Sequence, residues 1–407
     1  MVTTLFFMWG FVTVLNDVLV PHLKSIFDLN YARVMLIQCS FFSAYFIFSS
    51  PSARLIEWIG YHKTMVVGLF TMGLGALLFI PAASVASYPL FLAALMILAA
   101  GITALQVAAN PYVAALGSPE TASSRLNLAQ AFNSLGTTIG PYLGGALILA
   151  AVPQSMESVR HMSAKALTVY RIHEASSVKL PYLVIGIALL LLGISLARFK
   201  LPAIPQAKGY GETGPQKSIW KHHHLVLGMV GIFVYVGAEV SIGSFLINYF
   251  SQANIGNVSV LVAARYVSYY WGGAMVGRFV GSAILQRVRT GTVLGIAATT
   301  ACLLLCTSML TLGQMAMWSI LFVGFFNSVM FPSIFTLGIA ELGPLTGRGS
   351  GLLIMAIVGG AIIPVAQGAL ADRIGIHHAF ILPVICYLYI VFYAFRGSRP
   401  AVLASPR

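Results

Sequence analysis

Two acidic side chains lie inside long apolar segments of this chain, where a charge is energetically unfavourable. Eight of the ten Asp and Glu residues fall in polar connections or at the ends of apolar segments, whereas Asp17 and Glu239 lie deep within them. A carboxylate in a low-dielectric interior can take up a proton, or can hold a hard cation through its oxygens. We therefore predict that Asp17 and Glu239 couple a cation to the protein's activity, with Na⁺ one candidate ion at Asp17. The alternative is a structural role, in which either acid bonds helix backbone or pairs with a basic group.

Amide side chains accompany the two acids in the apolar segments. An amide offers both donors and an acceptor, which suits a neutral polyol whose hydroxyls need both. Gln106 and Asn327 each lie five residues before a proline, which frees a backbone carbonyl and lets a helix bend. Hydrogen bonding between helices is the alternative role for every amide. The polar residues that we predict to bind hydroxyl groups are Asn16, Gln106, Asn110, Gln130, Asn133, Glu239, Asn248 and Asn327.

Aromatic side chains near these positions could pack on the apolar C–H face of a sugar ring. Trp9 precedes Asp17 in the first apolar segment, and Tyr266 and Tyr270 lie in an aromatic stretch of a later one. We predict that these three line the same cavity. Trp and Tyr also gather at membrane surfaces for unrelated reasons, which is the alternative for each.

The composition identifies the elements that must position these side chains as membrane-spanning helices. Of the 407 residues, 58% are hydrophobic and 8% charged, whereas soluble domains are about 45–50% apolar and 25% charged. Soluble and disordered classes are therefore excluded, and about 20 apolar residues make one span. The predicted spans are 3–23, 33–53, 63–83, 89–112, 126–150, 181–199, 225–250, 260–285, 292–312, 316–340, 349–371 and 376–395.

The two halves of the chain resemble each other. The stretch Pro141–Leu147 recurs as Pro364–Leu370, 223 residues later, and Pro111 with its surroundings recurs around Pro332, 221 residues later. The two buried acids are 222 residues apart, which places them at equivalent positions. Parallel repeats of six helices are typical of secondary transporters whose site lies at the repeat interface. The acids are therefore expected to face one another across a central cavity.

The fold class predicted from these patterns is an all-α membrane protein of twelve transmembrane helices in two pseudo-symmetric six-helix bundles. The domains are an N-terminal bundle over 1–199, a linker over 200–224, and a C-terminal bundle with a short tail over 225–407. In this arrangement 14 Lys and Arg residues lie on the side of the termini and eight on the other. The excess of basic residues predicts that both termini and the linker are cytoplasmic.

Other functional classes find no support in the sequence. The net charge of +13 comes from basic residues scattered through loops, without a basic patch interleaved with aromatics, so nucleic acid is not an expected partner. We find no nucleotide-binding loop, no metal-ligand motif and no nucleophile–base pair, and expect neither an enzyme nor a cofactor. A membrane sensor would carry a soluble signalling domain, for which the linker and tails leave no room.

Several motifs resemble the fucose–galactose–glucose symporter family of the major facilitator superfamily. The resemblance extends over both halves of the chain. It is carried by Trp9–Gly10, Leu15–Pro21, Ala108–Tyr112, Arg125–Asn133, Tyr235–Ala238 and Phe331–Gly338.

The resemblance implies a sugar transporter that works by alternating access and is usually coupled to protons. The family's helix-1 aspartate corresponds to Asp17, but the acidic position in helix 4 of the fucose branch is Gln106 here, which cannot take up a proton. The fucose branch has glutamine at the position of Glu239, so the carboxyl group has in effect moved from helix 4 to helix 7. This pattern resembles the glucose/galactose branch, and leaves both H⁺ and Na⁺ open as the coupled ion.

We therefore expect a secondary active transporter that imports glucose or galactose together with a cation. It would be a monomer embedded in the lipid of a bacterial inner membrane. The alternatives are an L-fucose/H⁺ symporter, an uncoupled sugar uniporter, and a drug/proton antiporter of the same fold. Epimeric hexoses differ by the direction of one hydroxyl group, so the sequence does not rank them.

Overall fold

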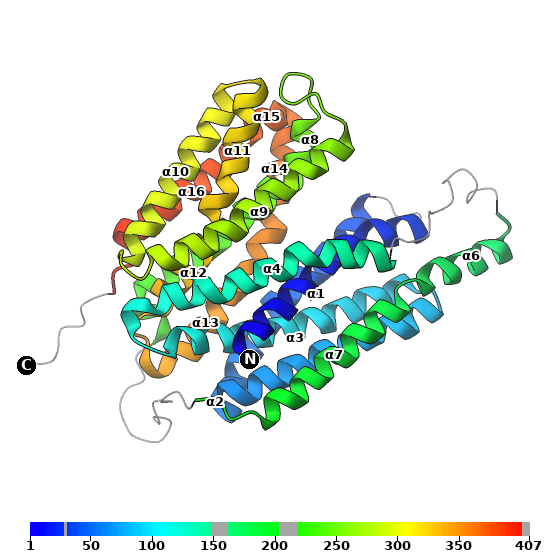
Figure 1. The fold of residues 1–407 in the computed structure, drawn as a ribbon, viewed down its shortest axis with the longest axis horizontal. Helices are drawn as coiled ribbons and strands as arrows, with labels where there is room; N and C mark the ends of the chain where they lie inside the picture. The colour runs from blue at the N-terminus through cyan, green and yellow to red at the C-terminus, as the bar shows by residue number, and fades with distance from the viewer. Residues whose placement is uncertain (28–30, 149–161, 203–217, 401–407) are drawn as a thin grey trace, which may run out of the picture. The chain divides into compact units, whose positions relative to one another are not determined.

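The computed structural model describes residues 1–27, 31–148, 162–202 and 218–400, and all regular structure in these ranges is helical (Figure 1). Within these ranges, the side chains at 16–18, 20–22, 24–25, 31–35, 141–148, 164–165, 168 and 260–261 are not among those described.

The first half of the chain contains six helices long enough to cross a membrane. They come from α1 (Val2–Phe27), α2 (Tyr31–Ser84), α3 (Tyr88–Ala115), α4 (Ala122–Ile148) and α7 (Lys179–Arg198). The 54-residue α2 counts twice, because Gly60 interrupts it with φ 81° and ψ 169°, a conformation that glycine adopts without steric cost. The shorter α6 (Ala164–Ser176) precedes α7.

The second half supplies six more spans from shorter pieces. The first three are single helices, α8 (His223–Phe250), α9 (Val260–Ile284) and α10 (Thr290–Leu310). The next three are interrupted, and consist of α11 (Gly313–Asn327) with α12 (Met330–Ile339), α13 (Thr346–Met355) with α14 (Gly359–Ile374), and α15 (Ile376–Ala379) with α16 (Ile381–Phe392). The prediction of twelve membrane-spanning helices is therefore confirmed over the described ranges.

The spans are apolar as well as long. By length and hydropathy, eight described helical segments qualify as membrane spans, and one of them, 36–84, holds the two arms of α2. The helices α1, α4 and α9 have 25 to 27 residues each, more than the ~20 that a bilayer core requires.

The described chain divides into two compact units. One unit contains residues 1–109 and 132–202, and the other contains residues 110–131 and 203–407. The segment 110–131 joins the second unit through the start of α4, where Ser124 Oγ donates a hydrogen bond of 2.7 Å to the Ser282 carbonyl. The Asn127 amide likewise donates to the Arg278 carbonyl at 2.7 Å. The predicted division at 200–224 into two six-helix bundles stays a prediction.

Glycines allow close helix packing inside each unit. In the first unit, Gly101 of α3 lies directly against Met72 of α2. In the second, Gly359 at the start of α14 lies against the backbone of Phe233 in α8. Small residues at such contacts are the usual means by which membrane helices approach, because lipid provides no hydrophobic drive.

The helices that contain Pro111 and Pro332 behave differently. Proline lacks an amide proton and its ring opposes the carbonyl four residues earlier. The helix containing Pro332 is interrupted at 328–329, between α11 and α12, whereas Pro111 lies within an unbroken α3. The interruption at 328–329 sets the end of α11 at Asn327, and the carbonyl of Asn327 accepts a hydrogen bond from another helix.

Candidate functional site

The second unit holds a buried polar cluster that begins on α8. Tyr235 and Glu239 are one helical turn apart, so their side chains share a face. The Tyr235 hydroxyl lies 2.8 Å from Glu239 Oε1 and 3.0 Å from the backbone carbonyl of Asn327. One phenolic proton thus has two acceptors, one on the carboxylate and one at the end of α11.

The Asn327 amide connects two further tyrosines to this pair. Its Nδ2 donates to the Tyr270 hydroxyl of α9 at 2.8 Å, and its Oδ1 accepts from the Tyr387 hydroxyl of α16 at 2.6 Å. Asn327 and the three tyrosines are at most 1% exposed, whereas Glu239 is half-buried. We call Tyr235, Glu239, Tyr270, Asn327 and Tyr387 the tyrosine–carboxylate cluster.

The cluster is built to tolerate two protonation states of Glu239. When the carboxylate is charged, Oε1 accepts the proton of Tyr235. When the carboxyl group carries a proton, the Tyr235 hydroxyl can donate to the Asn327 carbonyl instead. Among the described side chains, Arg278 of α9 also interacts electrostatically with Glu239. A change of charge at Glu239 therefore leaves the buried hydroxyl satisfied.

The predicted amides of the first unit bond to neighbouring helices. Gln106 Nε2 donates to the Tyr45 hydroxyl at 3.0 Å, and Asn133 Nδ2 donates to the Phe6 carbonyl at 3.1 Å. Trp9 packs on Phe6 with a ring-centroid separation of 4.4 Å. The two amide contacts are the interhelical role named above as the alternative, and each leaves the amide oxygen for a further donor, whereas Trp9 and Phe6 both belong to α1.

Four other predicted residues lie in different surroundings. Asn110 is fully buried, and neither of its amide atoms has a partner in the described part of the chain. The Gln130 side chain is also buried, while its carbonyl accepts a hydrogen bond of 3.2 Å from Arg278. Asn248 is exposed. Tyr266 packs edge-on against Phe250 and Trp318 rather than joining the tyrosine–carboxylate cluster.

The side chains of Asn16 and Asp17 lie outside the described residues, although their backbone belongs to α1. The coupling role of Asp17, a Na⁺ ion at that position, and its relation to Glu239 across a cavity stay predictions. In the described part of the chain, no three His, Cys, Asp or Glu side chains gather to hold a metal ion.

The structure brings together three predicted residues, Glu239, Asn327 and Tyr270, with two that the sequence analysis did not propose. Tyr235 carried a signal, since it lies four residues before Glu239 and faces the same way. Tyr387 carried none, because only the packing of α16 places its hydroxyl beside Asn327.

Glu239 places a carboxylate within one of the twelve membrane spans, and acids in such positions mark substrate and ion pathways in membrane proteins. The family model of the Major Facilitator Superfamily matches residues 1–357. The chain belongs to the major facilitator superfamily. This membership confirms the predicted fold class, and identifies the protein as an integral membrane transporter rather than an enzyme.

Its similarity to individual members of the superfamily covers nearly the full length. The chain is 52% identical to a glucose/galactose transporter of Brucella abortus, with 98% of this chain and 93% of the relative covered. It is 44% identical to a putative glucose/galactose transporter of Helicobacter pylori, with 98% and 96% covered. A crystal structure of the Escherichia coli fucose:proton symporter superposes with a TM-score of 0.88 at 33% identity, covering 97% and 96%. The predicted family is confirmed.

Proposed function

We propose that this protein is a secondary active hexose transporter, which imports glucose or galactose together with a cation by alternating access. The observation that carries the proposal is the tyrosine–carboxylate cluster, where a membrane-embedded Glu239 accepts from Tyr235 and the neighbouring Asn327 amide bonds to Tyr270 and Tyr387. An ionisable side chain within a membrane span costs free energy, so its presence indicates a function. Relatives that cover almost the whole chain carry the names of glucose/galactose transporters.

Coupling follows if ion and sugar favour the same arrangement of the transporter. A ligand shifts a conformational equilibrium only by its differential affinity for the two states. Neutralising a carboxylate in a low-dielectric interior lowers the free-energy cost of dehydrating it, which stabilises the state in which that group is dehydrated. Sugar hydroxyls that bond the amides of the same cavity then add to the same shift.

The proposed ion is H⁺. A 33% identical relative of known structure is a fucose:proton symporter, and Tyr235 lets Glu239 exist with or without a proton. Na⁺ held by the oxygens of Asp17 is the alternative. We further propose that the protein lies in the inner membrane of a bacterial cell with both termini in the cytoplasm. The monomer is the proposed transporting unit.

L-Fucose symport is the second candidate, and it rests on the overall superposition with the fucose:proton symporter. Against it stand the carboxyl group at Glu239 and the amide at Gln106. These two positions exchange the acid and amide of the fucose branch, so the cavity presents different donors to the sugar.

The test is uptake of labelled hexose into proteoliposomes under an imposed pH or Na⁺ gradient. We expect concentrative uptake of glucose and galactose driven by an inward H⁺ gradient, with unlabelled L-fucose competing weakly. Uptake driven only by a Na⁺ gradient would refute H⁺ as the coupled ion and support Na⁺. Concentrative uptake of L-fucose with none of glucose or galactose would replace the proposed substrate.

A further inference from the structure

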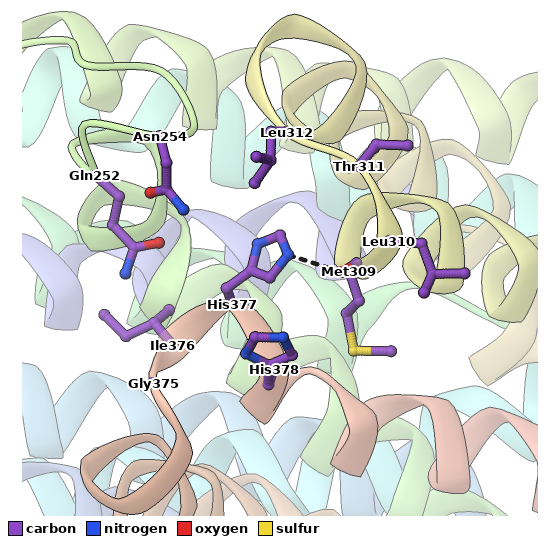
Figure 2. Close-up of a pocket in the computed structure, with 10 residues that line it drawn as sticks. All are labelled: Gln252, Asn254, Met309, Leu310, Thr311, Leu312, Gly375, Ile376, His377 and His378. Atoms are coloured by element: carbon purple, nitrogen blue, oxygen red, sulfur yellow. Dashed lines mark hydrogen bonds between the residues drawn. The ribbon is translucent and has the colours of Figure 1, made fainter.

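A cavity of about 390 Å³ lies in the second unit, and the transport mechanism above does not use it (Figure 2). It is formed where three helix junctions meet, namely the loop after α8, the turn between α10 and α11, and the turn between α14 and α15. None of its lining residues belongs to the tyrosine–carboxylate cluster. Glu239 and the end of α8 at Phe250 are 11 residues apart, or ~16 Å along the helix. The cavity is therefore a separate place.

The walls of the cavity are fixed by hydrogen bonds between the junctions. His377 Nε2 donates to the Met309 carbonyl at 2.7 Å, and its Nδ1 lies 3.2 Å from the Tyr249 hydroxyl. The Gly313 amide donates to the Asn254 carbonyl at 3.1 Å. Both nitrogens of His377 therefore bond to neighbouring helices. The polar side chains that can bond a ligand include those of Gln252, Asn254 and His378.

Residues with positive φ let the backbone reverse direction at these junctions. Gly313 and Gly375 have φ values of 63° and 82°, and Asn257 in the loop after α8 has φ 48°. Glycine adopts this conformation without steric cost, and asparagine adopts it more readily than most other residues. Here they fold three chain reversals around one hollow.

The polar groups that remain are neutral and of both hydrogen-bonding kinds. Figure 2 shows the amides of Gln252 and Asn254 on one side of His377, with Met309 and Leu310 on the other. Gln252 Oε1 is buried and has no hydrogen-bond partner in the described part of the chain. Because solvent does not reach that oxygen, a ligand hydroxyl can bond to it only if the Gln252 side chain turns toward the cavity.

The chemistry of the lining selects the class of ligand. No Asp, Glu, Lys or Arg is among the described residues that line the cavity, so ions have no counter-charge there. Two imidazoles, of which His377 is already engaged at both nitrogens, are too few to hold a metal. The amides of Gln252 and Asn254, the Thr311 hydroxyl and the His378 ring can bond the neighbouring hydroxyl groups of a sugar, which both donate and accept. The apolar side chains of Met309 and Leu310 can pack on the C–H face of the same sugar. The volume falls in the range of small-molecule sites, about 300–1,000 Å³.

We propose that this cavity is a second, peripheral hexose-binding site, built on Gln252, Asn254 and His378. The choice of hexose rests on the proposed function. The orientation proposed above places the site on the outer side of the membrane, where it would hold sugar before the sugar reaches the central cavity.

The test counts bound sugar on the purified full-length protein by equilibrium dialysis with labelled D-glucose. The variants are N254L/H378L for the cavity and N327L for the cluster, and Q314L is the control, because Gln314 is an exposed amide beside the same junction that does not line the cavity. We expect two equivalents for the wild type and Q314L, one for each of the other variants, and none when the cavity and cluster changes are combined. One equivalent in the wild type that N254L/H378L leaves unchanged would overturn the peripheral site and leave the proposed function intact.

A second measurement reports the cavity directly. In an N327L background, L312C is alkylated with a maleimide in the presence and absence of D-glucose, with the same background lacking L312C as the reference for native cysteines, because Leu312 lines the cavity and is not one of the three proposed binding residues. We expect glucose to slow alkylation at least threefold. An unchanged rate would refute the peripheral site even if the central cavity transports hexose, whereas absence of binding to every variant, wild type included, would refute both proposals.

Discussion

Asn327 offers the sharpest test of the tyrosine–carboxylate cluster, because a single amide satisfies two buried hydroxyls. N327L keeps the approximate shape of the side chain and leaves Tyr270 and Tyr387 without that partner. Hydrogen bonds between membrane helices contribute about 0.6 kcal/mol on average and up to about 1.7, so the loss of two costs ~1–3 kcal/mol. A unit of this size loses about 2–4 °C of melting temperature per kcal/mol. We expect a decrease of roughly 4–8 °C at the middle of that range.

The same reasoning predicts recovery when the stranded hydroxyls are removed as well. Replacing all partners of a buried hydrogen bond by apolar groups is nearly neutral, because no group is left unsatisfied. The triple variant N327L/Y270F/Y387F should therefore melt within about 2 °C of the wild type and still fail to transport hexose. The assay is thermal unfolding of the purified protein in detergent, with N248L as a control at an exposed asparagine. If N327L melts like the wild type, or the triple variant melts lower than N327L, the account of the cluster is wrong.

Two further substitutions test the cluster and the packing of α8. Y235F removes the donor to the Glu239 carboxylate, and a hydrogen bond to a charged group contributes about 1.5–3 kcal/mol. Half-maximal uptake by Y235F should therefore need at least ~10-fold more hexose than uptake by the wild type. The control is Y393F, which loses a hydroxyl bonded to the His224 carbonyl and should match the wild type. G359V forces a side chain against the backbone of α8 and should lower stability by about 1–3 kcal/mol in thermal unfolding. G272V, at a glycine where an added Cβ would meet no described atom within 4 Å, should cost less than ~1 kcal/mol, and equal losses for both variants would contradict the packing of α8 on α14.

The helices were predictable from the sequence because the bilayer dictates their length and apolar content. The spans around α7, α8 and α10 agree with the predicted ranges to within a few residues. The sequence could not foresee which proline would interrupt its helix, since Pro111 and Pro332 have similar surroundings in the two repeats. The packing of neighbouring helices decides that outcome, and only at Pro332 does the interruption deliver a carbonyl to a buried hydroxyl.

The site was predictable in part, and for a physical reason. A buried acid or amide is conspicuous in an apolar segment, so Glu239 and Asn327 could be found. A tyrosine is common both in membrane interiors and at their surfaces, so Tyr387 gave no signal in the sequence, and only the packing of α16 against α8 and α10 brings its hydroxyl to Asn327. Asn248 is exposed and its contact with sugar stays a prediction, because helical spacing alone does not separate a face that lines a cavity from a face exposed elsewhere. The peripheral cavity arises from three loops that sequence patterns do not bring together.

The most direct test of the central claim is hexose accumulation by wild type and E239Q in proteoliposomes under an inward pH gradient, with D17N measured alongside. Glutamine keeps an oxygen for the Tyr235 hydroxyl and cannot exchange a proton. We predict that E239Q and D17N exchange labelled for unlabelled hexose across the membrane but do not concentrate it. Accumulation by E239Q to the level of the wild type would show that the Glu239 carboxylate on α8 plays no part in coupling.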